Sequence, residues 1–224
     1  MDLRDIEDAV VRGDAPGVVA LVQQAVAEGV EPKQIIAESL VPAMAEVGVR
    51  FERAEFFVPE MLIASRAMQA GLGLLKPLMV GEQSTAVGRV VVGTVEGDVH
   101  DLGKNLVCTM LEGAGFEVVD LGADVPPEKF VTALRQAKTD IVGMSALMTT
   151  TMPAMERTMD ALGEAGLLDE VKVLVGGAPL TQEYCDQIGA DGYAPDASAA
   201  VRKARALVGE GQERTGPRPP RVRV

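Results

Sequence analysis

The feature that most constrains the fold is a regular alternation of short apolar runs and helix-like segments after residue 88. The apolar runs lie at 89–95, 116–121, 140–145 and 171–175, with a weaker fifth run at 191–194. The helix-like stretches lie at 103–114, 126–138, 152–166, 180–188 and 197–208. Apolar strands that alternate with helices are typical of a parallel sheet covered on both faces and joined by right-handed crossovers. The pattern predicts an α/β, doubly wound, five-stranded Rossmann- or flavodoxin-like domain.

Residues 1–80 show helical periodicity instead. Asp14 is placed to cap a helix, and Pro32 suits the first turn of another. A long apolar helical face follows the aromatic turn within 50–61. With a further helix over 2–12, this segment predicts a four-helix bundle, whose Met and Phe residues are most simply its core.

These patterns divide the chain into four parts. The helical bundle takes residues 1–80, a polar linker takes 81–88, and the α/β domain takes 89–209. Residues 210–224 are rich in proline and arginine and lack periodicity, which predicts a disordered tail.

Composition limits the partners. The chain has 21 basic and 33 acidic residues, a net charge of -12, and so lacks the basic surface that nucleic acid requires. Its two cysteines, Cys108 and Cys185, form no C-x-x-C pair, which favours a reducing compartment. The first ten residues lack the apolar core of a signal peptide, and no apolar run reaches the roughly 18–20 residues that span a bilayer. We expect a cytoplasmic protein that binds neither nucleic acid nor membrane.

The only histidine, His100, lies on the loop after the first predicted strand. Ligands of open parallel sheets bind beyond the carboxyl ends of the strands. Asp98 can accept one ring N–H and fix the tautomer, which leaves the other ring nitrogen as a ligand. Gly97 and Gly103 allow the backbone to pass close to a bulky group. A lone histidine is more often an ordinary surface or packed residue, but this context favours a ligand site.

Other common sites lack their residues. A zinc site needs three or four ligands, and one histidine with two distant cysteines does not supply them. A serine hydrolase would carry its serine in a G-x-S-x-G nucleophile elbow, and the segment "GMSALMT" does not match that motif. The loop that carries His100 matches neither the dinucleotide-binding nor the P-loop motif. One histidine suffices where a macrocycle already holds the metal, which leaves a cofactor with an open axial position.

Three short elements then carry a resemblance to a known family. D-V-H-D-L-G at 98–103 resembles the D-x-H-x-x-G signature of cobalamin-binding domains. S-A-L at 145–147 and G-G at 176–177 resemble that family's S-x-L and G-G elements, each at the end of a predicted strand. Residues 47–68 are similar to the helical cap of corrinoid proteins of methyltransferase systems and of cobalamin-dependent methionine synthase. The resemblance covers about 1–209, and the closest type is the stand-alone corrinoid protein of methylamine, methanol, methylthiol or methoxyaromatic methyltransferases.

This resemblance implies a bound cobalamin or related corrinoid whose cobalt takes His100 as its lower axial ligand. Asp98 would accept the other ring N–H of that histidine. In the family, a hydroxyl residue beyond S-x-L completes a hydrogen-bond relay with this aspartate and histidine. The distance from S-A-L along the sequence favours Thr151, with Thr149 and Thr150 as neighbours.

The remaining site residues are also implied by the resemblance. Ser145 and Leu147 would line the slot for the displaced nucleotide tail, and Gly176 and Gly177 would let the tail pass. Taken singly, each fits an ordinary strand end or turn. Five cap residues would cover the methyl-bearing face and keep it dry. The residues implied to contact the corrinoid are Gly97, Asp98, Val99, His100, Asp101, Leu102, Gly103, Ser145, Leu147, Thr149, Thr151, Gly176, Gly177, Val47, Phe51, Phe57, Met61 and Leu62.

The implied function is that of a methyl carrier, a non-autonomous component of a methyltransferase system. Such a protein accepts a methyl group on cobalt from a substrate-specific methyltransferase and passes it to a second one, whose acceptor is tetrahydrofolate or a thiol. A reductive activator is a further expected partner. One alternative is the small cobalamin-binding subunit of a carbon-skeleton mutase, against which the helical cap counts. Two others are a cobalamin-dependent sensor that acts through protein contacts and a Rossmann-like module with an accidental motif.

Overall fold

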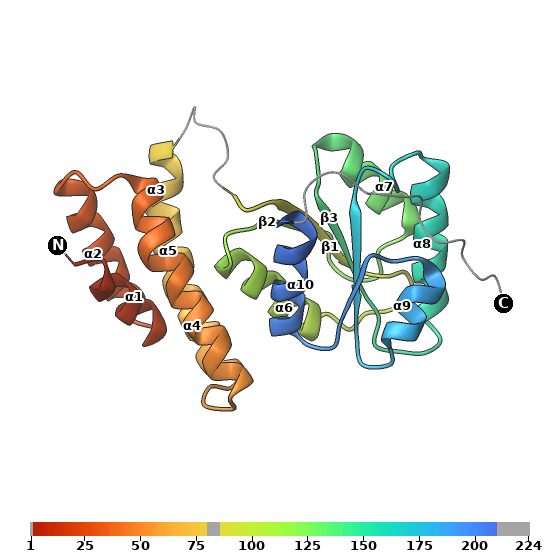
Figure 1. Cartoon of the computed structure of the whole chain (residues 1–224), viewed down its shortest axis with the longest axis horizontal. Coiled ribbons are helices and arrows are strands. Elements are labelled where there is room, and N and C mark those ends of the chain that lie inside the picture. The colour runs from red at the N-terminus through yellow and green to blue at the C-terminus, as the bar shows by residue number, and fades with distance from the viewer. Residues whose placement is uncertain (1, 80–85, 210–224) are drawn as a thin grey trace. The chain divides into compact units, whose positions relative to one another are not determined.

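The computed structural model describes residues 2–79 and 86–209 (Figure 1). They form two compact units, one of N-terminal helices and one containing the sheet. The predicted linker lies in part, at 81–85, outside the described residues, and the predicted tail at 210–224 lies wholly outside them. No helix in the described part of the chain is long and apolar enough to cross a membrane.

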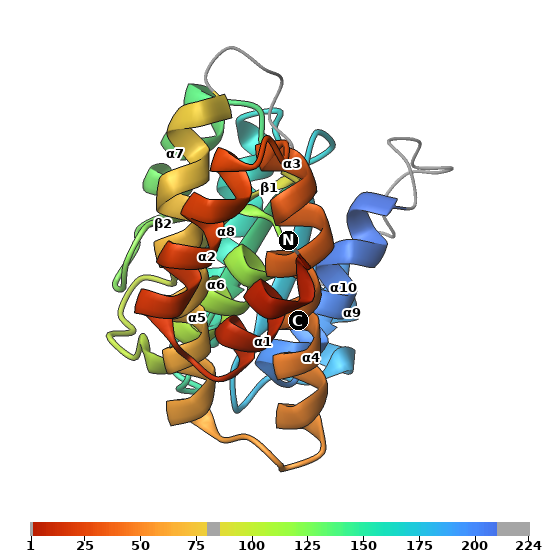
Figure 2. The ribbon, with the colours of Figure 1, turned by 90° about the vertical axis from the view of Figure 1, so that its left-hand side faces the viewer.

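The first unit consists of helices that pack side by side (Figure 2). They are α1 (Arg4–Val11), α2 (Ala15–Ala27), α3 (Pro32–Ile35), η1 (Ile36–Leu40), α4 (Val41–Glu52), α5 (Val58–Leu75) and η2 (Lys76–Met79). Asp14 caps α2 as predicted, because its carboxylate accepts the N–H of Gly17 at 3.0 Å. Segment η1 is a turn of π-helix between α3 and α4, and it precedes Pro42, which lacks a backbone N–H. Since α3, η1 and α4 follow one another without a break, the unit has four principal helices, as predicted.

The second unit contains a five-stranded parallel sheet with the order β2-β1-β3-β4-β5. Its strands are β1 (Arg89–Thr94), β2 (Glu117–Asp120), β3 (Ile141–Ser145), β4 (Lys172–Gly176) and β5 (Gly192–Ala194). Its helices are α6 (Leu102–Gly113), α7 (Pro127–Gln136), α8 (Met152–Glu164), α9 (Gln182–Ile188) and α10 (Ala197–Gly209). Figure 1 shows α7, α8 and α9 on one face of the sheet and α6 and α10 on the other. The predicted α/β fold is confirmed.

Both faces of the sheet are buried, which explains the continuous apolar runs in the sequence. Val90, Val91 and Val92 of the inner strand β1 are all buried, although they point to alternating faces. On the face covered by α7 and α8, Val91 belongs to one core cluster with Phe130 and Met155. Because β1 lies between β2 and β3, successive crossovers leave it in opposite directions. The carboxyl ends of β1 and β3 therefore form the ligand-binding switch point of this topology.

Candidate functional site

The three signature elements begin at adjacent strand ends. The sheet register pairs Thr94 of β1 with Ser145 of β3, and Ser145 with Gly176 of β4. Each of these residues is the last of its strand, so the loops that follow all leave the same edge of the sheet. The loop between β1 and α6, residues 95–101, is called the histidine loop. The structure thus brings the histidine loop, the S-A-L segment and the glycine pair together at the switch point.

Asp98 is the central acceptor of this edge, and its side chain is fully buried. Its Oδ1 accepts the backbone N–H of His100 at 3.0 Å and lies 2.8 Å from His100 Nδ1. Its Oδ2 accepts the backbone N–H of Leu147 and the hydroxyl of Thr151, each at 2.7 Å. One carboxylate therefore joins the loop after β1 to the loop after β3.

These hydrogen bonds also settle the charge of Asp98 and the tautomer of His100. Burial raises the pKa of Asp98, but donors from Leu147, His100 and Thr151 outweigh burial and hold the pKa well below its usual range. An ionised carboxylate only accepts hydrogen bonds, so Nδ1 of His100 must be the donor. The neutral ring then carries its lone pair on Nε2. Since the His100 side chain is 47% exposed, this nitrogen can serve as a metal ligand.

Stability should depend on Asp98 in acid. A group with a depressed folded-state pKa contributes stability that is present above its unfolded value, about 3.9, and is lost as the pH falls toward the folded value. Between pH 4 and pH 2.5, we expect the unfolding free energy of ligand-free wild type to fall more steeply than that of Asp98→Asn. The added slope is up to about 1.4 kcal/mol per pH unit. Urea unfolding followed by circular dichroism measures both slopes. Thr151→Val, which removes one donor, should lie between them, and equal slopes in all three proteins would contradict the depressed pKa.

Of the three candidate hydroxyls, the buried one is Thr151, just before α8, and it reaches Asp98. Its oxygen also lies 2.9 Å from the carbonyl of Met148, but its single proton can go to only one acceptor. The charged carboxylate is the closer and stronger acceptor. Thr149 and Thr150 are exposed.

Apolar side chains are exposed beside the imidazole. Val99 is 71% exposed, Leu102 76%, Leu147 45% and Met148 36%. Three of these were expected from the sequence, whereas Met148 was missed, although it follows S-A-L directly and is the most apolar residue of the next four. Exposed apolar groups around an available imidazole are typical of a binding site, and they fit a large, largely apolar ring.

The glycines of the site differ in what they must accommodate. A Cβ on Gly103 would meet no non-neighbouring atom of the described residues within 4 Å. Gly177 has φ +134°, and a Cβ there would lie 1.8 Å from the carbonyl oxygen of Ala146. At Gly176 the nearest atom would be the Ala194 carbonyl oxygen at 3.0 Å. The fold itself therefore requires a glycine at 177, whether or not Gly176 and Gly177 also leave room for a ligand.

The other expected residues fall into clear groups. Asp101 is exposed at the end of the histidine loop, and Ser145 is half-buried. Among the residues of the first unit, Val47 and Met61 are fully buried, as core residues are, and Phe51 is half-buried. The exposed ones are Phe57 and Leu62, at 61% and 38%.

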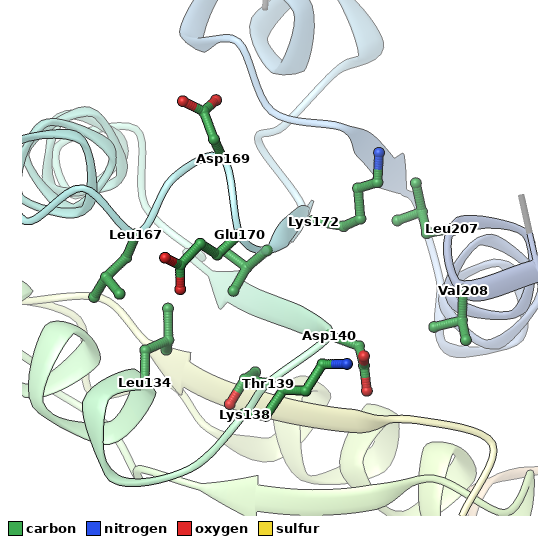
Figure 3. A pocket seen from close by; sticks show the side chains of 11 residues that line it. Leu134, Lys138, Thr139, Asp140, Leu167, Asp169, Glu170, Lys172, Leu207 and Val208 are labelled. Carbon is green, nitrogen blue, oxygen red and sulfur yellow. The ribbon is translucent and has the colours of Figure 1, made fainter. Parts of the chain in front are cut away.

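Neither a metal cluster nor the cavity between β3, β4 and α10 offers a competing site in the described part of the chain. Within residues 2–79 and 86–209, no group of three His, Cys, Asp or Glu side chains could hold a metal. A cavity of about 540 Å³ lies at the opposite, amino edge of the sheet, between Asp140 and Lys172 at the starts of β3 and β4 and Leu207 of α10 (Figure 3). It is remote from the histidine loop.

Comparison with known proteins decides the family. Residues 88–202 match the model of the B12 binding domain, and residues 2–76 match a second B12 binding domain model. The chain is 48% identical over 207 residues to the dimethylamine corrinoid protein of Methanosarcina barkeri, which covers 92% of this chain and 97% of that protein. The chain belongs to the corrinoid protein family.

Two further matches support the same family. The trimethylamine corrinoid protein 1 of Methanosarcina acetivorans is 43% identical over 204 residues, 90% of this chain and 94% of that protein. The methanol:cobalamin methyltransferase complex MtaBC from Methanosarcina barkeri matches with a TM-score of 0.85 and 32% identity, over 93% of this chain and 80% of that one. The predicted family and the predicted corrinoid cofactor are confirmed.

Proposed function

We propose that this corrinoid protein is the methyl carrier of a methylamine methyltransferase system and that dimethylamine is the methyl donor. The observation that carries the proposal is the half-exposed imidazole of His100, fixed through Nδ1 by a buried carboxylate. The choice of donor is supported by the 48% identity to the dimethylamine corrinoid protein, against 43% to the trimethylamine protein.

When bound, the corrinoid supplies a cobalt atom that carries the methyl group from one methyltransferase to the next. The protein's own residues would hold the corrinoid and set how strongly the imidazole donates to its cobalt. His100 would hold the cobalt through Nε2, and Asp98 keeps Nδ1 protonated, a second contact that raises the donor strength of the imidazole. The exposed side chains of Leu147 and Met148 would pack against the bound corrin and keep water from it.

The partners follow from this role. A donor-specific methyltransferase delivers the methyl group, and a second methyltransferase passes it to tetrahydrofolate or a thiol, while a reductive activator maintains the cofactor. The likeness to a chain of the methanol:cobalamin methyltransferase complex supports docking with such a methyltransferase.

The axial ligand can be tested because His100 is the only histidine of the chain. Untagged protein is loaded with cobalamin, reduced to Co(II) and studied by electron paramagnetic resonance. We expect a three-line nitrogen splitting that becomes two-line when the histidine is labelled with ¹⁵N. His100→Gly should lose this splitting, and added imidazole should restore it. Absence of corrinoid uptake by the wild type would overturn the function.

The donor is tested separately with a dimethylamine-specific methyltransferase. Dimethylamine should methylate the loaded protein at least tenfold faster than trimethylamine or methanol do. Ligation by His100 without any transfer from dimethylamine would leave the carrier role and overturn the choice of donor.

A further inference from the structure

The loop after β2 contacts the histidine loop at its start. Oδ1 of Asp124 accepts the N–H of Gly97 at 2.7 Å, and the N–H of Asp124 donates to the carbonyl of Asp98 at 2.9 Å. One residue thus holds a peptide group before Asp98, through the Gly97 N–H, and the peptide group after it, through the Asp98 carbonyl. Asp124 itself adopts φ +51°, a left-handed conformation that few residues other than glycine, asparagine and aspartate adopt readily.

The same β2 segment contacts the histidine loop at its end. Lys104, in the first turn of α6, is only 2% exposed, and its Nζ donates to Oδ1 of Asp120 at 2.6 Å and to Asn105 at 2.6 Å. Asp120 is the last residue of β2, and its Oδ1 also accepts the N–H of Gly122 at 2.8 Å. A buried ammonium group is unfavourable unless it is paired, so this ion pair holds α6 against β2.

Between these two attachments lie only Val99 to Gly103, the segment that carries His100. Neither aspartate is hydrogen-bonded to the imidazole in the described structure. The rest of the segment is restrained by Asp98 and by the Thr94 hydroxyl, which donates to the His100 carbonyl at 3.1 Å. Both ends of the segment that carries His100 are therefore attached to residues of β2 or of the loop after it, and β2 is an edge strand.

We propose that Asp120 and Asp124 form a two-aspartate clamp that positions His100 for its axial bond to the corrinoid metal. Both are positioning residues, since they act through the ends of the loop. The inference rests on the proposed function for the identity of the ligand but not for the clamp itself, which is present in the protein alone.

The Asp124 half is tested with a matched pair of variants. Asp124→Gly keeps the left-handed conformation at low cost and removes the carboxylate, whereas Asp124→Asn keeps both an acceptor oxygen and a tendency to that conformation. In corrinoid-loaded protein at one fixed pH, the ratio of His-ligated to His-free cobalt should fall at least tenfold in Asp124→Gly. In Asp124→Asn it should stay within twofold of wild type. Visible absorption and the nitrogen splitting measure this ratio.

A readout on ligand-free protein separates the clamp from the function. Hydrogen exchange at the Gly97 amide should be at least tenfold faster in Asp124→Gly than in Asp124→Asn. If wild type shows no His100 ligation but this difference in exchange, the proposed function fails and the clamp stands. Equal exchange and equal ligation in both variants would overturn the clamp.

The Asp120 half needs a variant that separates positioning from folding. Asp120→Asn leaves Lys104 with a buried charge and should lower the melting temperature and the ligated fraction together. Adding Lys104→Met removes the charge and should restore the melting temperature, while the ligated fraction stays at least fivefold below wild type. Recovery of both quantities would overturn the positioning role of Asp120.

Discussion

Gly177→Ala is expected to destabilise the protein by roughly 3–5 kcal/mol, the sum of a strained backbone and an overpacked site. The φ of +134° is one that residues with a Cβ rarely adopt, and the new methyl carbon would lie 1.8 Å from the Ala146 oxygen. That oxygen cannot move freely, because the Ala146 N–H donates to the Gly176 carbonyl at 3.2 Å and ties the two loops together. Urea unfolding of ligand-free protein measures the loss.

Gly103→Ala is the matched control. No non-neighbouring atom of the described residues lies within 4 Å of its added Cβ, and alanine suits the first turn of α6. The free energy of unfolding should stay within about 0.5 kcal/mol of wild type. Its corrinoid affinity should nevertheless fall if the open space at Gly103 receives the ring. Equal stability of the two variants would show that the Gly177 backbone can relax.

This contrast marks how far sequence reasoning reaches. The five strands and their helices follow from local periodicity, and the structure places each within about two residues of its predicted bounds. The D-x-H spacing is likewise local, so the Asp98–His100 contact could be predicted. Gly177, by contrast, looks like any turn glycine, because the atom that forbids a side chain belongs to a residue 31 positions earlier, Ala146. Only the pairing of β3 with β4 reveals it.

Thr151 and Asp124 also differ in how far the sequence alone could identify their roles. The spacing from S-A-L favours Thr151 over its two neighbours, and the structure supplies the reason. The residue before Met152, the first of α8, is the one whose side chain turns inward to Asp98. Asp124 left no signal in the sequence, since aspartates in loops are common. Its role depends on the bridge between Val95 and Val125, which aligns the loops after β1 and β2.

Asp98→Asn is expected to reverse the tautomer of His100. Three donors face Oδ2, the backbone N–H groups of Leu147 and Met148 and the Thr151 hydroxyl, so the amide oxygen would turn toward them. Its NH₂ group would then replace Oδ1, where it faces Nδ1 and donates to it, while the backbone N–H of His100 loses its acceptor. The ring proton moves to Nε2, the nitrogen that the cobalt needs, and we expect binding between the imidazole and cobalt to weaken by about 10–100-fold.

A single histidine makes this change directly measurable. In ligand-free protein labelled with [¹⁵N]histidine, at a pH where the ring is neutral, the nitrogen shifts of wild type should show Nδ1 protonated and those of Asp98→Asn should show Nε2 protonated. Thr151→Val is the control, because it removes a donor to Oδ2 and leaves the contact between Oδ1 and Nδ1 in place. It should therefore retain the wild-type tautomer. Protonated Nε2 in the wild type would contradict the assignment, because the lone pair would then face Asp98 rather than the corrinoid.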